Sequence, residues 1–238
     1  MPGLGTIVNV CAIAAGGILG CGAGKLFSDK LRETLLSVCG LMVCFLGIGG
    51  TLSKMLVIQD GALSATGTMM MVFSLLIGTI IGSLLDIDRR VEALGVWLRN
   101  RTGNAKDPAF VSAFVSASLT VCVGAMAVIG SIEDGVYANH AVLFMKAILD
   151  FSIIVAMAAA MGPGTIFSAI PVGVVQGAIT ALARLAAPCL TDAAMGNLSY
   201  VGNILITCVG INLLFPGKIR VANLLPSLII AILWVYLF

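Results

Sequence analysis

Lys146 and Asp150 form an oppositely charged pair inside the apolar run 141–161. Side chains four residues apart lie on one face of a helix, so an ammonium and a carboxylate at this spacing can meet. A charge in the hydrocarbon of a membrane costs about 3 kcal/mol or more unless it is paired, neutralised or hydrated. We therefore predict that Asp150 contacts an ion, a proton or a solute, with Lys146 as its partner or as a contact for an anion.

Each of the two residues also has a simpler interpretation. Lys146 lies about one turn nearer the end of the run, so its ammonium could extend to the membrane surface. Asp150 is too short to do so, but it could make a structural hydrogen bond to a neighbouring helix.

The composition of the chain indicates where this pair lies. Of 238 residues, 60% are hydrophobic and 10% are charged, whereas soluble domains have about 25% charged residues. We therefore expect one all-α integral membrane domain over residues 1–238. The net charge of +2 gives no reason to expect nucleic acid as a partner. With one histidine and no Walker, HExxH or GxSxG motif, no metal site, cofactor or enzymatic activity is predicted.

Apolar runs of about 20 residues are long enough to span a membrane as helices. Eight such runs are present, at 5–24, 35–57, 64–85, 109–130, 141–161, 164–185, 195–215 and 219–238. The sequence therefore predicts a transmembrane helical bundle of about eight spans. The sixth run contains Pro171 and the eighth contains Pro226, which leaves open whether these two are full spans or broken or re-entrant segments. Pro171-Val-Gly173 is the expected position of a break.

Basic residues are distributed unevenly between the connections. The connections after the first, third, fifth and seventh runs contain Lys25, Lys30, Arg32, Arg89, Arg90, Arg99, Arg101, Lys106, Lys218 and Arg220. The connections on the other side contain only Lys54 and Arg184. The positive-inside rule places the first set in the cytoplasm and both termini outside it. Within the connection after the third run, residues 86–100 have apolar residues at helical spacing and predict a helix in the inner membrane interface.

Polar side chains within the predicted spans could line a polar cavity. Taken singly, each is typical of a hydrogen bond between helices. Together with the charged pair, the candidate site comprises Thr6, Asn9, Lys146, Asp150, Ser168, Gln176, Asn203 and Asn212. Asp134, by contrast, is expected in a solvated external turn.

Short sequence matches suggest an internal repeat. Gly5-Thr-Ile7 begins the first run and Gly164-Thr-Ile166 begins the sixth, and the runs that follow share Gly47-Ile-Gly49 and Gly210-Ile-Asn212. Because the first and sixth runs are an odd number of spans apart, equivalent helices would run in opposite directions. Runs 1–3 and 6–8 would then form an inverted repeat, a common plan of secondary transporters. Gly-rich apolar sequence also matches itself by chance, so both interpretations stay open.

Several stretches spread over nearly the whole chain resemble a bacterial membrane family usually called YqgA/YdfK. They are Gly5-Thr-Ile-Val-Asn9, Leu31-Arg-Glu-Thr-Leu35, Cys122-Val-Gly-Ala-Met-Ala127, Glu133-Asp-Gly135, Lys146-Ala-Ile-Leu-Asp150, Gln176-Gly-Ala-Ile-Thr180 and Lys218-Ile-Arg-Val-Ala-Asn-Leu-Leu-Pro226. The resemblance implies a bacterial inner-membrane protein and brings no substrate or catalytic residue, because the family's function is unknown. The family usually has Pro where this chain has Ala125, which argues against a helix break there.

These patterns predict a secondary transporter or ion-coupled permease with its site between the first, fifth, sixth and seventh runs. Its partners would be the lipid bilayer and a small solute or ion, and a homo-oligomer is left open. The alternative is a non-transporting membrane scaffold or sensor.

The distribution of basic residues makes a prediction about topology. A reporter enzyme that is active only outside the cytoplasm should be active when fused after Phe238 and inactive when fused near Arg101. The reverse pattern would contradict the orientation, and activity at both positions would contradict the number of spans.

Overall fold

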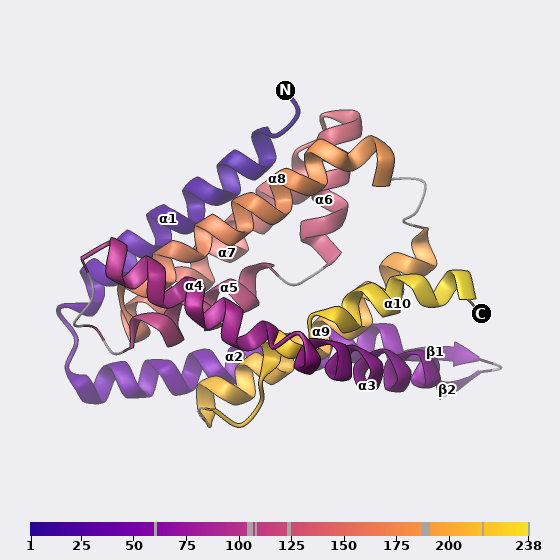
Figure 1. Ribbon diagram of the computed structural model, residues 1–238, viewed down its shortest axis with the longest axis horizontal. Helices are drawn as coiled ribbons and strands as arrows, with labels where there is room; N and C mark the ends of the chain where they lie inside the picture. The colour runs from indigo at the N-terminus through magenta and orange to yellow at the C-terminus, as the bar shows by residue number, and fades with distance from the viewer. Residues whose placement is uncertain are drawn as a thin grey trace.

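The computed structural model describes residues 1–59, 61–103, 107, 109–122, 125–186, 191–215 and 217–237, and this part of the chain is almost entirely helical (Figure 1). The elements are α1 (Leu4–Gly24), α2 (Asp29–Met55), β1 (Leu56–Gln59), β2 (Ala62–Ala65), α3 (Thr68–Leu84), α4 (Ile87–Arg101), α5 (Phe110–Cys122), α6 (Ala125–Tyr137), α7 (Ala141–Met161), the 3-10 helix η1 (Pro163–Ser168), α8 (Ala169–Ala186), α9 (Asp192–Leu214), the 3-10 helix η3 (Val221–Leu224) and α10 (Pro226–Leu237).

The predicted helical membrane bundle is confirmed, but eight spans exceed what length and composition support. In the described residues, five helical segments are long and apolar enough to cross a membrane: α1, residues 33–55 of α2, α7, η1 with α8, and α9. Two bent pairs, α3 with α4 at 56° and α5 with α6 at 73°, raise the number to at most seven. The predicted eighth run forms η3 and α10, which together make a shorter apolar helix, Val221–Leu237, that is not among these candidate spans.

The predicted fourth run, 109–130, is divided between two helices. α5 ends at Cys122 and α6 begins at Ala125, while residues 123 and 124 lie outside the described part of the chain. Hydropathy measures how apolar a segment is and does not report whether its helix is continuous, so the break was not predicted.

A β-hairpin that the sequence analysis missed joins α2 to α3. β1 and β2 pair antiparallel, and they occupy positions where the second and third runs were predicted to continue as helices. The sequence between the strands is Asp60-Gly61, a dipeptide that favours two-residue hairpin turns, and Gly61 has a φ of 77°.

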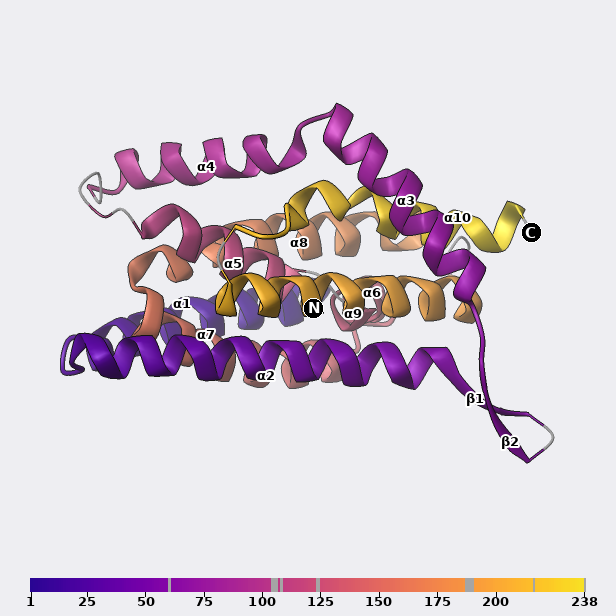
Figure 2. The same ribbon diagram turned by 90° about the horizontal axis from the view of Figure 1, so that it is seen from below.

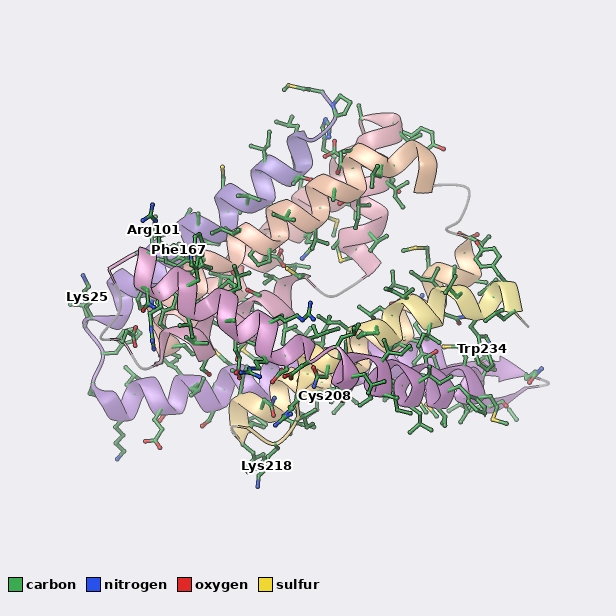
Figure 3. All side chains as sticks on the ribbon, viewed as in Figure 1. Lys25, Arg101, Phe167, Cys208, Lys218 and Trp234 are labelled. Atoms are coloured by element: carbon green, nitrogen blue, oxygen red, sulfur yellow. The ribbon has the colours of Figure 1, made fainter. Side chains whose placement is uncertain are left out.

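The ends of the bundle differ in charge. Lys25, in the α1–α2 turn, and Arg101, at the end of α4, lie at one end (Figure 3). The hairpin and the end of α10 lie at the opposite end (Figures 1 and 2). The basic connections of the first and third runs therefore share one side, as predicted. Lys106 lies outside the described residues, and the position of the Arg184 side chain is not described.

Glycines set the distance between α1 and α7. Three glycines four residues apart lie on one face of α1, and a Cβ on any of them would press against α7. Such small residues let membrane helices approach closely. The backbone contacts join Gly16 to Phe151, Gly20 to Val155 and Gly24 to Ala159. The constant separation of 135 residues shows that the two helices run parallel in fixed register, which brings Asn9 beside the turn of α7 that carries Lys146 and Asp150.

Three further helix pairs pack antiparallel. α1 lies against η1 and α8, α2 against α9, and α3 against η3 and α10. The contacts are between Gly17 and Ile166, Val10 and Gly173, Gly47 and Thr207, Gly40 and Leu214, Gly78 and Ser227, and Gly82 and Asn223. The antiparallel directions are those that alternating spans require.

The close approach of α1 and α7 can be tested with two glycines of the same helix. A Cβ on Gly20 would collide with the carbonyl of Val155 and with Ala158, whereas nothing lies within 4 Å of a Cβ on Gly22. We expect Gly20→Val to destabilise the protein by about 2 kcal/mol through overpacking, and Gly22→Val to change stability little. The midpoint of thermal unfolding in detergent measures both, and equal shifts would mean that helix propensity, not packing, is responsible.

Candidate functional site

The predicted charged pair is a direct contact. The Lys146 ammonium Nζ donates to both carboxylate oxygens of Asp150, at 2.8 Å to Oδ1 and 2.6 Å to Oδ2. Lys146 is 8% exposed and Asp150 is 4% exposed. The ammonium is therefore held inside the bundle, and the interpretation that Lys146 reaches for the membrane surface is wrong.

Lys146 also completes the broken end of α5. Its Nζ donates to the backbone carbonyl of Val121 at 2.8 Å. Val121 lies in the last turn of α5 as described, and carbonyls in the last turn of a helix have no amide within that helix to accept from. A cation also stabilises the negative end of the helix dipole. One ammonium thus neutralises Asp150 and satisfies backbone that would otherwise be unpaired deep in the protein.

Two expectations about helix breaks are corrected. The helix ends beside Ala125 although this chain lacks the Pro of the resembled family, and Ala125 is the first residue of α6, the position where helices tolerate Pro best. Pro171 does not break a helix, since it lies in the first turn of α8, where the missing N–H is not needed. The irregular stretch is instead η1, which directly precedes α8.

Two amides complete the site. The Asn9 Nδ2 group donates to Asp150 Oδ2 at 3.0 Å and to Gln176 Oε1 at 3.3 Å. Both amide residues are almost completely buried, at 0% and 1% exposure. Asn9 Oδ1 and Gln176 Nε2 have no hydrogen-bond partner among the described residues. Lys146, Asp150, Asn9 and Gln176, hereafter the central cluster, come from α7, α1 and α8, while α5 supplies the Val121 carbonyl.

The other predicted site residues lie elsewhere. Thr6 is close, since its hydroxyl pairs with that of Thr180 at 3.4 Å, one turn along α1 from Asn9. Ser168 donates to the carbonyl of Thr165 within η1. Asn203 bonds to Ser199 of its own helix and packs against α2. Asn212 binds the backbone of Ile219, so α9 contributes no predicted residue to the central cluster.

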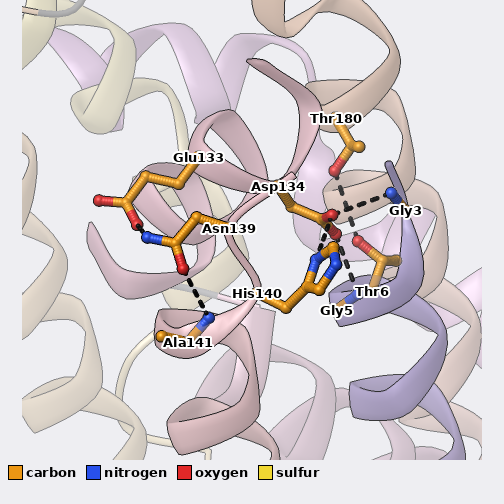
Figure 4. Close-up of polar contacts among 9 residues, drawn as sticks. All are labelled: Gly3, Gly5, Thr6, Glu133, Asp134, Asn139, His140, Ala141 and Thr180. Atoms are coloured by element: carbon orange, nitrogen blue, oxygen red, sulfur yellow. Dashed lines mark hydrogen bonds and ion pairs between the residues drawn. The ribbon is translucent and has the colours of Figure 1, made fainter. Parts of the chain in front are cut away.

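Asp134 forms a second buried carboxylate site, contrary to the prediction of a solvated turn (Figure 4). Its side chain accepts from the backbone N–H groups of Gly3 and Gly5, each at 3.0 Å, and lies 2.8 Å from His140 Nδ1. A carboxylate is stabilised at this position because it satisfies unpaired amides at the positive end of the α1 dipole. The sequence signal for this site was the spacing of Asp134 and His140, an acid and a histidine six residues apart between two apolar runs.

Two surface recesses approach the central cluster. One, the α1–α8 recess, has a volume of about 630 Å³ and is lined by residues that include Gly3, Thr6, Gly135 and Thr180. The other, the α4–α5 recess, has a volume of about 560 Å³ and extends along α5 to Leu119, two residues before Val121. No residue of the central cluster lines either recess. Among the described residues, no three His, Cys, Asp or Glu side chains gather as a metal site requires.

The sequence of this chain matches a known protein family. A family model described as "Protein of unknown function (DUF554)" matches residues 4–236. The chain belongs to the DUF554 family. Its relatives include "Uncharacterized protein YqgA" of Escherichia coli (strain K12), 25% identical over 96% of this chain and 94% of the relative. "Uncharacterized membrane protein YdfK" of Bacillus subtilis (strain 168) is 25% identical over 95% and 93%.

The DUF554 match confirms the resemblance found in the sequence, and no solved structure matches the chain. The match includes the whole central cluster and, apart from Pro2 and Gly3, the lining of both recesses. With its several apolar helices, this DUF554 protein is a multi-pass membrane protein.

The Lys146–Asp150 contact predicts non-additive mutations. We expect Lys146→Met or Asp150→Asn alone to lower stability by about 3 kcal/mol, because each leaves an uncompensated buried group. Lys146→Met should cost about 1 to 3 kcal/mol less in the Asp150→Asn background than in the wild type. Thermal unfolding of the four detergent-solubilised proteins measures this coupling. Additive effects would show that the two groups act independently.

Proposed function

We propose that this DUF554 protein is a secondary transporter or ion-coupled permease of the bacterial inner membrane, with the central cluster as its binding site. The observation that carries the proposal is a buried ion pair bonded to the Asn9 amide, which in turn bonds to the Gln176 amide. The two amides retain an unpaired acceptor and an unpaired donor. Buried polar networks with a structural role have their hydrogen bonds satisfied. Unpaired atoms at the centre of a membrane bundle therefore favour a ligand.

The surroundings of the central cluster support transport. One recess reaches Thr6 and Thr180 from the side of the α1 N-terminus, and the other reaches Leu119 from the side of α4. The residues of the central cluster line neither recess, which fits a transport site that is closed to both sides. The Val121 carbonyl at the site comes from the last turn of α5, beside the α5–α6 break, and discontinuous helices form the binding sites of many secondary transporters.

An inverted repeat of the first three and last three predicted spans is part of the proposal. Gly47 packs on Thr207 and Asn203, while Gly210 packs on Cys44 and Gly40. One separation of 163 residues relates Gly47 to Gly210, Cys44 to Thr207 and Gly40 to Asn203. Any antiparallel helix pair has a local two-fold axis, so the packing alone would not indicate a repeat. The same separation of 163 residues, however, relates the two Gly-Ile motifs in the sequence. The contact is thus reciprocal, as a two-fold relation requires.

The proposed orientation of the chain in the membrane rests on the uneven distribution of Lys and Arg between the connections. The end of the bundle that carries Lys25 and Arg101 would face the cytoplasm, and both termini would lie outside it.

The competing function is a membrane scaffold or sensor that transports nothing. In that case the charged pair and its amides would only join helices. Interhelical hydrogen bonds in membranes average about 0.6 kcal/mol, so Asn in place of Asp150 would change function little.

Reconstitution in liposomes separates the two functions. We expect the wild type to pass protons, detected by an internal pH-sensitive dye, or solutes from a cell metabolite extract, detected by mass spectrometry of the vesicle contents. Asp150→Asn should remain folded and lose this flux, because it removes the buried charge. Asp192→Asn, at an exposed aspartate of α9, is the matched control. A wild type that passes neither protons nor solutes, or a folded Asp150→Asn protein with normal flux, would contradict the proposal.

A further inference from the structure

The hydrogen bonds of the central cluster fix the orientation of both amides. Asn9 faces two acceptors, Asp150 Oδ2 and Gln176 Oε1, so its NH₂ group must point to them and its carbonyl must point away. Gln176 presents its carbonyl to Asn9, which leaves its NH₂ group unbonded. The free acceptor, Asn9 Oδ1, and the free donor, Gln176 Nε2, therefore belong to two amides bonded to each other.

The charges of the central cluster cancel. Lys146 and Asp150 are in direct contact, and the other described groups bonded to the pair are the neutral Asn9 side chain and the Val121 carbonyl. A cation placed here would meet the ammonium, and an anion would meet the carboxylate. Either repulsion strengthens with burial, because the surroundings screen charges less than water does. The site therefore disfavours ions of both signs.

The approach to the site is uncharged as well. The α1–α8 recess is lined by Pro2, Gly3, Thr6, Ile7, Gly135, Gly177, Thr180 and Ala181. Its polar side chains are the two threonine hydroxyls, which pair with each other one turn from Asn9. A hydroxyl both donates and accepts, so this lining offers the same neutral hydrogen bonds as the site.

From this geometry we infer that the solute is a small uncharged amide or alcohol. Its oxygen would accept from Gln176 Nε2, and its N–H or O–H would donate to Asn9 Oδ1. The inference rests on the proposed function, and it specifies a neutral solute where that function admits an ion.

Proteoliposomes test this chemistry with defined probes. Stopped-flow light scattering would follow the entry of acetamide, propionamide, ethylene glycol and glycerol, while radiolabelled sodium and chloride report ions. We expect at least one neutral probe to enter faster than into protein-free vesicles, with no acceleration of either ion. Amides alone or alcohols alone would identify which of the two groups is bound.

Two variants connect this flux to the site. Gln176→Met keeps side-chain length but removes the free donor, together with the carbonyl that accepts from Asn9, and should slow the neutral probe about tenfold. Gln59→Met, at an exposed position of β1, should have no effect. Thr180→Val, which removes a recess hydroxyl, should also slow entry and serves if Gln176→Met does not fold.

The outcomes separate this inference from the proposed function. Accelerated flux of sodium or chloride alone would overturn the neutral solute while leaving a transporter. Neutral probes that enter no faster than into empty vesicles would also overturn it, and the proton and metabolite assays would then decide whether the protein transports at all.

Discussion

The structure depends on one constraint, which is that charges and broken backbone deep in a membrane bundle must be satisfied by the protein itself. Lys146 meets both requirements, because its ammonium binds the Asp150 carboxylate and the free carbonyl of Val121. The break between α5 and α6 and the charged pair on α7 therefore explain each other. Without the ammonium, a carboxylate and a helix end would both be left unpaired in the interior.

The first helix is joined to the rest of the bundle by two carboxylates of different kinds. Asp134 binds the backbone amides at its N-terminus, and Asp150 binds the Asn9 side chain two turns further along. Each acid has a basic partner, His140 in the first case and Lys146 in the second. The glycines of α1 fix its register on α7, and the two carboxylates, one on α6 and one on α7, bind α1 near its N-terminus and at Asn9. The recess beside Thr6 and the central cluster are thereby mechanically connected.

Sequence reasoning predicted what composition and local spacing determine. The bounds of α7 agree with the predicted run 141–161, and the i, i+4 spacing of its charges gave the direct pair. Asn9 and Gln176 were correctly named as candidates, but so were Ser168, Asn203 and Asn212, which lie elsewhere. Apolar runs show that a polar residue is inside the membrane without showing which neighbour it faces. That depends on the register and rotation of packed helices, which the glycine contacts of the folded chain determine.

The ion pair is better understood as an orienting device than as a source of stability. A buried pair gains little over well-packed apolar residues of similar volume, so stability alone gives no reason to place one here. What the pair provides is a fixed carboxylate, toward which the Asn9 amide must turn its NH₂ group. The Asn9 carbonyl and the Gln176 NH₂ group, on two amides bonded to each other, are then held unbonded before any ligand arrives. Preorganised polar groups on rigid helices bind a ligand without an ordering cost. Here the Lys146–Asp150 pair, whose charges cancel, holds the neutral amides of Asn9 and Gln176 in place.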